Sequence, residues 1–370
     1  MNPAKTAAMS VLVVLLTLTA RAAEPEQIEV FTAGQDGYHT YRIPALAVTT
    51  KGTVLAFAEA RKKGTSDTGD IDVVLKRSTD GGKTFSPGQV VWDDQANTCG
   101  NPCPIIDRDT GVIWLLLTHN LGKDRENDLT AGKAVGTRSI WLSKSEDDGQ
   151  TWAKPIDISK PAKKEGWTWY ATGPGAGIQT KSGRLIAPCD HKRADDTGYS
   201  HVLYSDDHGK TWQVGGVLGP GVNECKIAEL SDGSLILNMR NYPKGEQRHR
   251  ATAISKDNGL TWSEIRHDRT LVEPICHASL IRASANAHLF SNPAHESKRQ
   301  NLTVRLSEDD CKTWPHAKTL HAGPAAYSDL AALADGTILC LYERGDKSSY
   351  EKITLARFTL DWLKQPRSTK

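Results

Sequence analysis

Short apolar runs that each follow a turn residue recur along the whole chain. They alternate with polar stretches, and sustained helical periodicity is scarce. Six of these runs begin directly after a residue that tolerates a tight turn: Gly52, Gly111, Gly183, Gly233, Asn286 and Gly336. Glycine adopts positive φ without steric cost, and asparagine tolerates it better than most other residues. The pattern therefore predicts six β-hairpin units and an all-β chain.

A second motif, Ser-x-Asp-x-Gly-x-Thr-aromatic, recurs between these strands. Its five copies start at Ser78, Ser145, Ser205, Ser255 and Ser307, and the starts lie 67, 60, 50 and 52 residues apart. The motif is typical of a turn, because the aspartate accepts from free backbone N–H groups, the glycine permits positive φ and the aromatic residue anchors the returning strand. Cys311 replaces the glycine of the last copy. We expect that turn to be strained or to adopt a different conformation.

A repeat of this length indicates one supersecondary unit that is stacked many times. The two ends of the repeated region also have the composition of strands, over residues 28–31 and 352–362. If both lie in one blade, the ring closes and no sheet edge is left free. We therefore predict a single six-bladed β-propeller over residues 24–370, with a β-sandwich or a solenoid as the alternative.

The first residues have the organisation of a signal peptide. Lys5 precedes an apolar run from Ala7 to Ala20, and Ala20-Arg21-Ala22 is a small-x-small cleavage site. We expect residues 1–23 to be removed and the protein to be exported, either secreted or periplasmic; an uncleaved N-terminal anchor is the alternative. The sequence has no second long apolar segment, so we expect no transmembrane segment in the mature chain.

Charge and cysteine content limit the possible partners. The net charge of +2 gives no strong field that would attract nucleic acid or an anionic membrane. The seven cysteines are an odd number, and their pairing stays open. Cys99 and Cys103 are the closest pair, and without a second pair of this kind they do not indicate a zinc site. No metal is expected.

Charged and phenolic residues recur at two fixed positions relative to the turn residue of their unit. Arg42, Glu224 and Tyr327 lie nine or ten residues before it, and Arg240 and Glu343 lie seven residues after it. Their neighbours are apolar and should be buried, so the innermost strands should enclose a polar cavity on the axis of the ring. Two further candidates for lining it share the second position: Glu59 and Asp190.

A set of short strings contains these residues: 41–44, 59–61, 66–70, 223–224, 238–241, 291–293 with Arg299, 327–330 and 341–343. In type and order they resemble the site motifs of the exo-α-sialidases (neuraminidases) of the bacterial and animal type. The resemblance runs from about residue 28 to the C-terminus, and the Ser-x-Asp turns correspond to the Asp boxes of that family. Asp boxes occur in many other propellers, so the site motifs carry the argument.

The resemblance implies a role for each matched residue. Arg42, Arg240 and Arg299 look like the arginine triad that holds the carboxylate of the sugar. Glu343 looks like the acid that fixes the first of these arginines. Arg305 lies close to Arg299 in the sequence, but Arg299 fits the spacing of the family better. Guanidinium suits such a triad because its planar, forked donors match a carboxylate.

The resemblance also implies the catalytic residues. Asp67 looks like the general acid and Arg61 like an additional arginine near the sugar. Tyr327 looks like the nucleophile and Glu224 like its partner base. A neutral phenol can attack beside the carboxylate of the substrate, where a second carboxylate would meet like-charge repulsion. An ordinary aspartic acid is ionised at neutral pH, so either the surroundings of Asp67 raise its pKa or the pH optimum is acidic.

Together these points predict a retaining exo-α-sialidase, a glycoside hydrolase that acts on sialylated glycans as a monomer, without metal or organic cofactor. One alternative is the same fold acting on a related nonulosonic acid, such as the deaminated sugar, or transferring the sugar to another glycan. Another is a propeller that binds glycan or protein without catalysis. Linkage preference would depend on rim loops, among them the polar insertion at residues 119–138.

Some of these residues also have structural interpretations. Asp67, Asp70 and Asp72 could be loop carboxylates or calcium ligands. Trp167 and Trp169 could contact an aglycone or pack in the core. Four histidines have no catalytic partner at a recognisable spacing and receive no role: His119, His191, His201 and His277.

Overall fold

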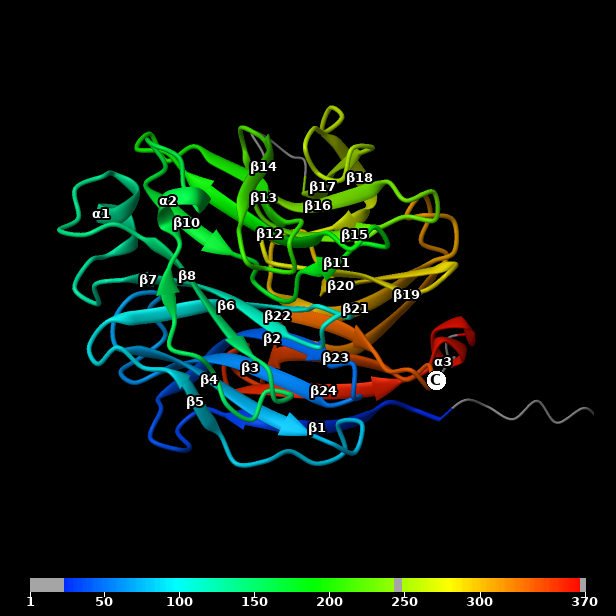
Figure 1. Cartoon of the computed structure of the whole chain (residues 1–370). Helices are drawn as coiled ribbons and strands as arrows, with labels where there is room; N and C mark the ends of the chain where they lie inside the picture. Colours follow the sequence, from blue (N-terminus) through cyan, green and yellow to red (C-terminus); the bar gives the residue numbers. More distant parts are fainter. Residues whose placement is uncertain (1–22, 243–247, 367–370) are drawn as a thin grey trace, which may run out of the picture.

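The computed structural model describes residues 23–242 and 248–366, and within them nearly all regular structure is β-strand (Figure 1). Residues 1–22 of the expected signal peptide lie outside the described residues. The three helices of the described part are short: α1 (Glu126–Thr130), α2 (Ser159–Ala162) and α3 (Leu360–Lys364). None of these helices is long and apolar enough to cross a membrane. The predicted all-β class is confirmed.

Two of the four hydrogen-bonded sheets contain more than one repeat unit. The sheet with both ends of the ring has the order β1 (Glu26–Thr32), β24 (Lys352–Phe358), β23 (Ile338–Arg344), β22 (His316–Ala332), β21 (Gln300–Ser307), β20 (Ala287–Pro293) and β19 (Ser279–Ser284). The second has the order β2 (Thr40–Val48), β3 (Val54–Arg61), β4 (Ile71–Ser78), β6 (Thr98–Ile106), β7 (Ile113–Asn120), β8 (Ser139–Ser145) and β9 (Ile156–Asp157), with β5 (Gln89–Trp92) paired to β4.

The other two sheets complete the ring. One has the order β10 (Trp169–Thr172), β12 (Leu185–Lys192), β13 (Gly198–Ser205) and β14 (Gln213–Leu218), with β11 (Ile178–Gln179) paired to β12. The other has the order β15 (Val222–Glu229), β16 (Leu235–Asn241), β17 (His249–Ser255) and β18 (Arg266–Val272). Among the described residues all pairings are antiparallel except the single parallel bridge between Ile71 and Thr98.

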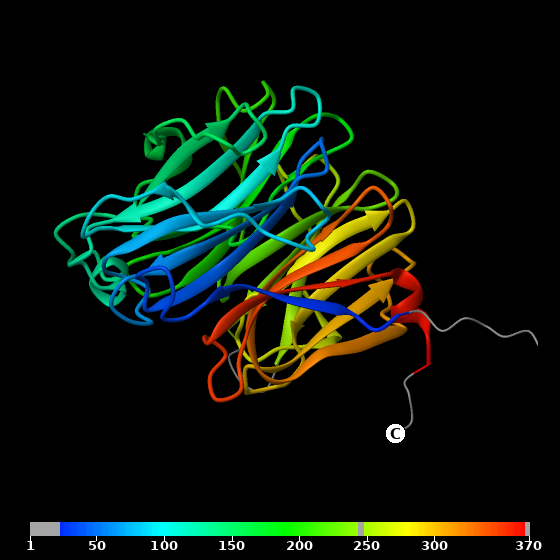
Figure 2. The same ribbon diagram turned by 90° about the horizontal axis from the view of Figure 1, so that it is seen from below.

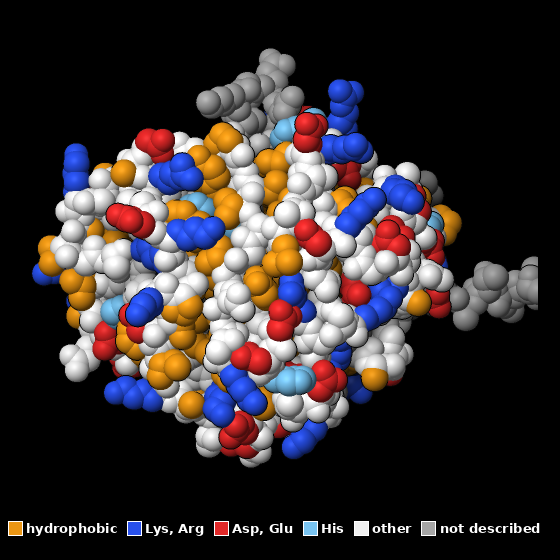
Figure 3. All heavy atoms as spheres, turned by 45° about the horizontal axis from the view of Figure 1, so that its top comes forward, with side chains coloured by type: hydrophobic (Ala, Val, Ile, Leu, Met, Phe, Trp, Pro, Cys, Tyr) orange, Lys and Arg blue, Asp and Glu red, His pale blue; other side chains and the backbone are white. Residues whose placement is uncertain are grey.

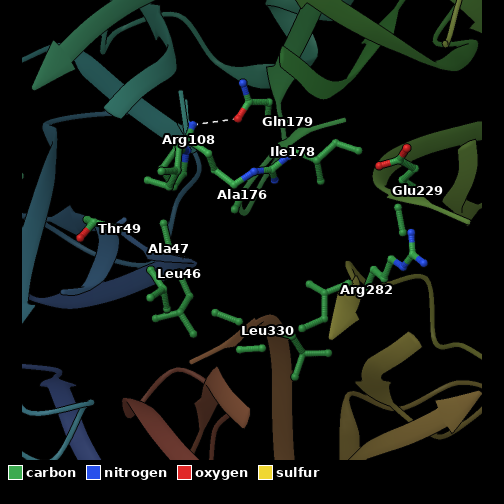
Figure 4. Close-up of a pocket in the computed structure, with 18 of the residues that line it drawn as sticks. Leu46, Ala47, Thr49, Arg108, Ala176, Ile178, Gln179, Glu229, Arg282 and Leu330 are labelled. Carbon is green, nitrogen blue, oxygen red and sulfur yellow. Dashed lines mark hydrogen bonds between the residues drawn. The ribbon is translucent and has the colours of Figure 1, made fainter. Parts of the chain in front are cut away.

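The innermost strands of the units face a common axis. β2 contacts both β6 and β22, and β15 and β19 continue the ring between β12 and β22. Figure 4 looks into the wider of two cavities on this axis, with Leu46 from β2, Ile178 from β11 and Leu330 from β22 around it. A ring of antiparallel sheets around a channel is the architecture of a β-propeller, as predicted.

The first and last strands close the ring. β1 pairs antiparallel with β24, from Glu26 opposite Arg357 to Thr32 opposite Lys352, and Figure 2 shows these first (blue) and last (red) strands side by side. The predicted strand over 352–362 is too long, because a helix begins at Leu360. The Thr359 side chain accepts a hydrogen bond from the backbone N–H of Trp362 and so caps that helix.

The Ser-x-Asp turns all use the same hydrogen bonds. In the first copy Ser78 Oγ donates to Asp80 Oδ1 at 2.7 Å and accepts from the N–H of Gly82 at 2.8 Å. Asp80 also accepts from the backbone and the hydroxyl of Thr84, at 3.0 and 2.6 Å. Cys311 makes the equivalent bond from its N–H to Ser307 Oγ at 2.9 Å with φ 61°. That turn therefore keeps the common conformation, with a cysteine in the left-handed region.

Each of these turns also packs against the preceding unit. A Cβ atom added at Gly209 would lie 2.1 Å from Trp114 of β7, and one at Gly82 would lie 2.6 Å from Leu355 of β24. At Gly149 the distance to Leu55 of β3 would be 3.0 Å. At these three positions glycine is therefore favoured both by its positive φ and by the close approach of the neighbouring side chain. The turns thus pack neighbouring units against each other.

The cysteines are buried, and charges of both signs are mixed on one face of the surface. All seven cysteines are buried as free thiols. On the face shown in Figure 3, cationic and anionic side chains are interspersed. That face has no broad region of one sign that would attract a polyanion.

We predict that Gly209→Ala lowers the free energy of unfolding more than Gly233→Ala. Both glycines have φ of +83°, but nothing lies within 4 Å of a Cβ at Gly233. Both variants place alanine in the left-handed region, which costs about 1–2 kcal/mol, and only Gly209→Ala adds overpacking of about 1–3 kcal/mol. Urea unfolding of both variants measures the difference. Equal losses would mean that the turn does not pack tightly on β7.

Candidate active site

A polar cavity of about 130 Å³ opens on the axis, at the end of the channel opposite the wider cavity of Figure 4. The predicted site residues that line it are Arg42, Arg61, Asp67, Glu224, Arg240, Arg299 and Tyr327. They come from the inner strands β2, β15 and β22, from β3 and β16 beside them, and from two loops. The structure thus brings together residues that are spread over most of the sequence.

A tyrosine and a glutamate share a short hydrogen bond inside this cavity. The Tyr327 hydroxyl donates to Glu224 Oε1 at 2.5 Å. Arg240 Nη1 donates to Glu224 Oε2 at 2.7 Å and to the Tyr327 hydroxyl at 3.0 Å. Burial and the Glu224 carboxylate raise the pKa of Tyr327 well above its ordinary value. The phenol is therefore neutral, and a proton acceptor is already in contact with it.

Glu343 lies behind the cavity and orders its wall. Its carboxylate accepts from Nε and Nη2 of Arg42, at 3.1 and 3.4 Å, and from the backbone N–H groups of Ile43 and Tyr327, at 2.9 and 3.0 Å. Ile43 has φ 56°, a rare conformation for a β-branched residue, at an irregularity of the β2 ladder. The fully buried carboxylate of Glu343 therefore holds both the strained backbone at Ile43 and the guanidinium group of Arg42 next to it.

Asp67 lies at the mouth of the cavity with half of its side chain exposed. Its Oδ1 atom is 2.7 Å from Arg61 Nη2 and 3.5 Å from Arg42 Nη1. Burial acts to raise the pKa of Asp67, but the guanidinium groups of Arg61 and Arg42 outweigh it and bring the pKa below its ordinary value. The sequence left two alternatives for Asp67, a pKa raised by its surroundings or an acidic pH optimum. For the unliganded protein the first alternative is wrong.

The third arginine of the cavity is Arg299. It lines the cavity, donates to the Tyr350 hydroxyl at 3.0 Å and to the carbonyl of Ile275 at 3.2 Å, and has no carboxylate partner among the described residues. Arg305 lies on β21, where it donates to Asn292, and is not among the described residues that line the cavity. The geometry groups Arg299, and not Arg305, with Arg42 and Arg240.

The sequence interpretation missed two residues next to these arginines. Tyr350 accepts from Arg299 and its ring lies 4.0 Å from the guanidinium carbon of Arg42, so one side chain touches two arginines. Arg138, the residue before β8, lines the cavity, stacks on Trp169 at 4.1 Å and donates only to neutral oxygens. Neither occupies a repeated position, because Tyr350 and Arg138 both lie outside the regular strands. A buried arginine is visible only in the folded chain.

The two additional candidates from the repeat have different positions. Glu59 lines the cavity and accepts from Arg61 at 2.6 Å. Asp190 is fully buried, is not among the described residues that line the cavity, and accepts from the Asn223 amide at 2.7 Å. Burial, followed by the nearby Glu224 carboxylate, raises the pKa of Asp190.

The structure also separates the open interpretations of the aspartates and aromatic residues. Asp72 accepts from the Tyr38 hydroxyl at 2.6 Å and pairs with Lys62, whereas Asp67 faces arginines. The one group of possible metal ligands in the described part of the chain lies elsewhere: Asp107, Asp109 and His208. Trp169 lines the cavity, whereas Trp167 stacks on His191 at 3.6 Å in the core.

Comparisons with known proteins place the chain among related sequences. Residues 52–340 match the model of the BNR repeat-like domain. The chain is 36% identical to a sialidase of Micromonospora viridifaciens and 35% identical to one of Bacteroides fragilis, over 89% and 84% of its own length. It spans 53% and 61% of the length of those two bacterial relatives.

Two further matches cover more of the related protein. An exo-alpha-sialidase of Aspergillus fumigatus is 32% identical, over 98% of this chain and 93% of the fungal one. The solved structure of the Hadza microbial sialidase Hz136 superposes with a TM-score of 0.83 at 31% identity, over 91% of this chain and 69% of that one. The fold is thus that of a sialidase-type β-propeller.

We predict that Glu343→Gln lowers the free energy of unfolding by about 3–5 kcal/mol, because it leaves the Arg42 guanidinium buried without its main counterion. Glu308→Gln is the matched control. Glu308 pairs with Lys364 at the surface, both side chains being more than 40% exposed, and loss of such a pair costs at most about 1 kcal/mol. Urea unfolding with an unchanged m-value tests both. Similar small losses in the two variants would contradict the importance of Glu343.

Proposed function

Because this chain belongs to the exo-α-sialidase family, we propose that it is a retaining exo-α-sialidase that hydrolyses terminal α-ketosidically linked sialic acid from glycoproteins, glycolipids or oligosaccharides. The observation that carries the proposal is the 2.5 Å hydrogen bond from the Tyr327 hydroxyl to Glu224, inside a cavity that Arg42, Arg240 and Arg299 also line. A tyrosine nucleophile is the known departure of sialidases from the two-carboxylate scheme of most glycosidases.

The cavity has groups that suit the carboxylate of the sugar. Arg42 pairs with Glu343 and Arg240 with Glu224, but Arg299 contacts only neutral oxygens. The buried Nε–H of Arg240 has no hydrogen-bond partner among the described residues. A bound carboxylate would supply the missing counterion and acceptor, through charge-assisted bonds to planar guanidinium groups.

In the proposed first step, Tyr327 oxygen attacks the anomeric carbon while its proton passes to Glu224. The bond to the leaving oxygen breaks, and Asp67 gives that oxygen a proton. In the second step a water molecule attacks the same carbon, Asp67 takes a proton from the water, and the bond to Tyr327 breaks. The phenolate then recovers its proton from Glu224. Two displacements at one carbon retain the anomeric configuration.

Asp67 must gain its proton for this cycle. In the unliganded protein, where burial acts in the opposite direction, the guanidinium groups of Arg61 and Arg42 keep the pKa of Asp67 below its ordinary value. When the carboxylate of the substrate binds beside Arg42, part of this positive field is neutralised and the pKa rises. We therefore expect protonation to accompany substrate binding and the pH optimum to be acidic.

The finer features of the fold and the setting are part of the same proposal. The ring would consist of six blades, the Ser-x-Asp turns would be the Asp boxes of the family, and residues 24–370 would form one catalytic domain that acts as a monomer. The protein would be exported after loss of residues 1–23. The reaction as written requires no metal or cofactor.

We predict that Tyr327→Phe reduces kcat/KM for 4-methylumbelliferyl α-N-acetylneuraminide by at least about 10²-fold, because it removes the nucleophilic oxygen and keeps the ring. Tyr342→Phe is the matched control. Its hydroxyl is also hydrogen-bonded, to Gln27 at 2.6 Å, but outside the cavity. Release of the fluorophore between pH 4 and 8 measures the activity of both. A folded wild-type chain without turnover at any pH would contradict the proposal.

Proton NMR during the first minutes of the reaction tests the stereochemistry. The α-anomer of the free sugar should appear first and then mutarotate. Early appearance of the β-anomer would exclude retention. Release of the fluorophore without free sugar would indicate transfer, and turnover of only the deaminated substrate would indicate a related acid sugar.

We also predict that kcat/KM falls as the pH rises from the acidic range, and that Arg61→Met moves this decline to higher pH. Kcat/KM reports ionisations of the free enzyme. Removing a cation 2.7 Å from Asp67 destabilises the carboxylate and raises its pKa, so the protonated form persists to higher pH. A pH profile of wild type and variant measures the shift. A decline that stays in place would exclude Asp67 as the proton donor.

A further inference from the structure

A buried ion pair lies on the axis of the ring, between the two cavities. Lys226 Nζ is 2.8 Å from Asp329 Oδ1, and the two side chains are 2% and 0% exposed. Neither residue is among those that line either cavity in the described part of the chain. The catalytic steps proposed above do not use this pair.

The Asp329 carboxylate joins the inner segments of the ring. Its Oδ2 atom accepts from the backbone N–H groups of Leu46 on β2 and Ala176 before β11, at 2.9 and 2.8 Å. Its Oδ1 atom accepts from Lys226 on β15 and from the Ser279 hydroxyl on β19, at 2.8 and 2.9 Å. Figure 4 shows Leu46, Ala176 and the neighbouring Leu330 converging around the channel.

The strands that carry this ion pair also carry the nucleophile and its base. Lys226 follows Glu224 by two residues on β15, and Asp329 follows Tyr327 by two residues on β22. Two residues of extended chain span about 7 Å. The same two strands are thus bridged twice at neighbouring levels of the axis, by Lys226–Asp329 and by Glu224–Tyr327.

Backbone pairing does not set the distance between these two strands. β15 and β22 belong to different sheets. Moreover, the ladder of β15 shifts register between Val222 and Cys225, and that of β22 between Ala325 and Ser328. Glu224 and Tyr327 therefore lie in irregular stretches, whereas Lys226 and Asp329 are in regular register with β16 and β23. Apart from the contacts of Glu224, Tyr327 and Arg240 themselves, the ion pair links the two strands only two residues away, where both strands are regular.

We infer that the Lys226–Asp329 ion pair is a positioning device that holds Glu224 and Tyr327 in contact. The inference rests on the proposed function. A buried ion pair adds little net stability compared with apolar residues of similar size. Its fixed geometry, however, determines how β15 and β22 approach each other. Small displacements of reacting groups are costly, since about 1 Å can reduce the rate about 10²-fold.

The test is Lys226→Met, which keeps most of the side-chain volume and removes the charge. We expect kcat for the fluorogenic sialoside to fall about 10- to 100-fold. KM should change less than about threefold, because the arginines that bind the carboxylate do not contact Lys226. Arg77→Met is the control. Arg77 pairs with Asp148 at 3.3 Å outside both cavities, so its loss should leave kcat unchanged.

A second readout needs no turnover. In protein labelled with ¹³C at the tyrosine Cζ, the signal of Tyr327 is the one absent from Tyr327→Phe. This signal should shift in Lys226→Met and stay in place in Arg77→Met. An inactive wild type would contradict the proposed function, but the shift of the Tyr327 signal in Lys226→Met would still report on positioning. If Lys226→Met had the kcat of the wild type and left the Tyr327 signal in place, the inference would be overturned.

Lys226→Met leaves the Asp329 carboxylate buried without its cation, and the variant could fail to fold. Lys226→Met/Asp329→Asn removes both charges and serves as the second variant. The same fall in kcat and the same shift are expected. A folded double variant with wild-type values of both would refute the positioning role as clearly as the single variant.

Discussion

The carboxylate of Asp329 is the point on which the centre of this ring depends. A ring of sheets leaves its inner strands without backbone partners across the axis, so side chains must join them. Asp329 does this with four short hydrogen bonds to segments from four parts of the chain. Gly175 shows how close the approach is, because a Cβ there would lie 2.8 Å from the Asp329 carboxyl carbon. The cavity that holds Tyr327 is built directly above this point.

A second buried carboxylate plays a similar part in the wall of the cavity. Glu343, like Asp329, is a fully buried carboxylate that accepts from backbone N–H groups and from one cation. Glu343 orients Arg42, and Asp329 holds Lys226. Charge is thus used to fix geometry around the reacting groups, where loss of a partner is costly because a buried charge is left unpaired.

The sequence was sufficient for features that follow from the repeat. Arg42, Glu224 and Tyr327 could be found because a strand next to an axis presents residues at a constant distance from its turn. Arg138 and Tyr350 could not, since both lie outside the regular strands: Arg138 lines the cavity, and Tyr350 contacts two of its arginines. The pKa of Asp67 depends on where the guanidinium groups of Arg61 and Arg42 lie, which no pattern reveals. The helix at residues 360–364 was missed because a short apolar run fits a strand equally well.

The pairing of β1 with β24 determines when the molecule can become a ring during its synthesis. Residues 26–32 are made before the other strands of the described ring, but their partner at residues 352–358 comes only after nearly all of those strands. Until then β1 and β23 both present open edges, which are prone to pair with other chains. A chain that stops before residue 352 would keep both edges. Closure of the ring is therefore one late step, and the edges of β1 and β23 stay open to aggregation until β24 has been made.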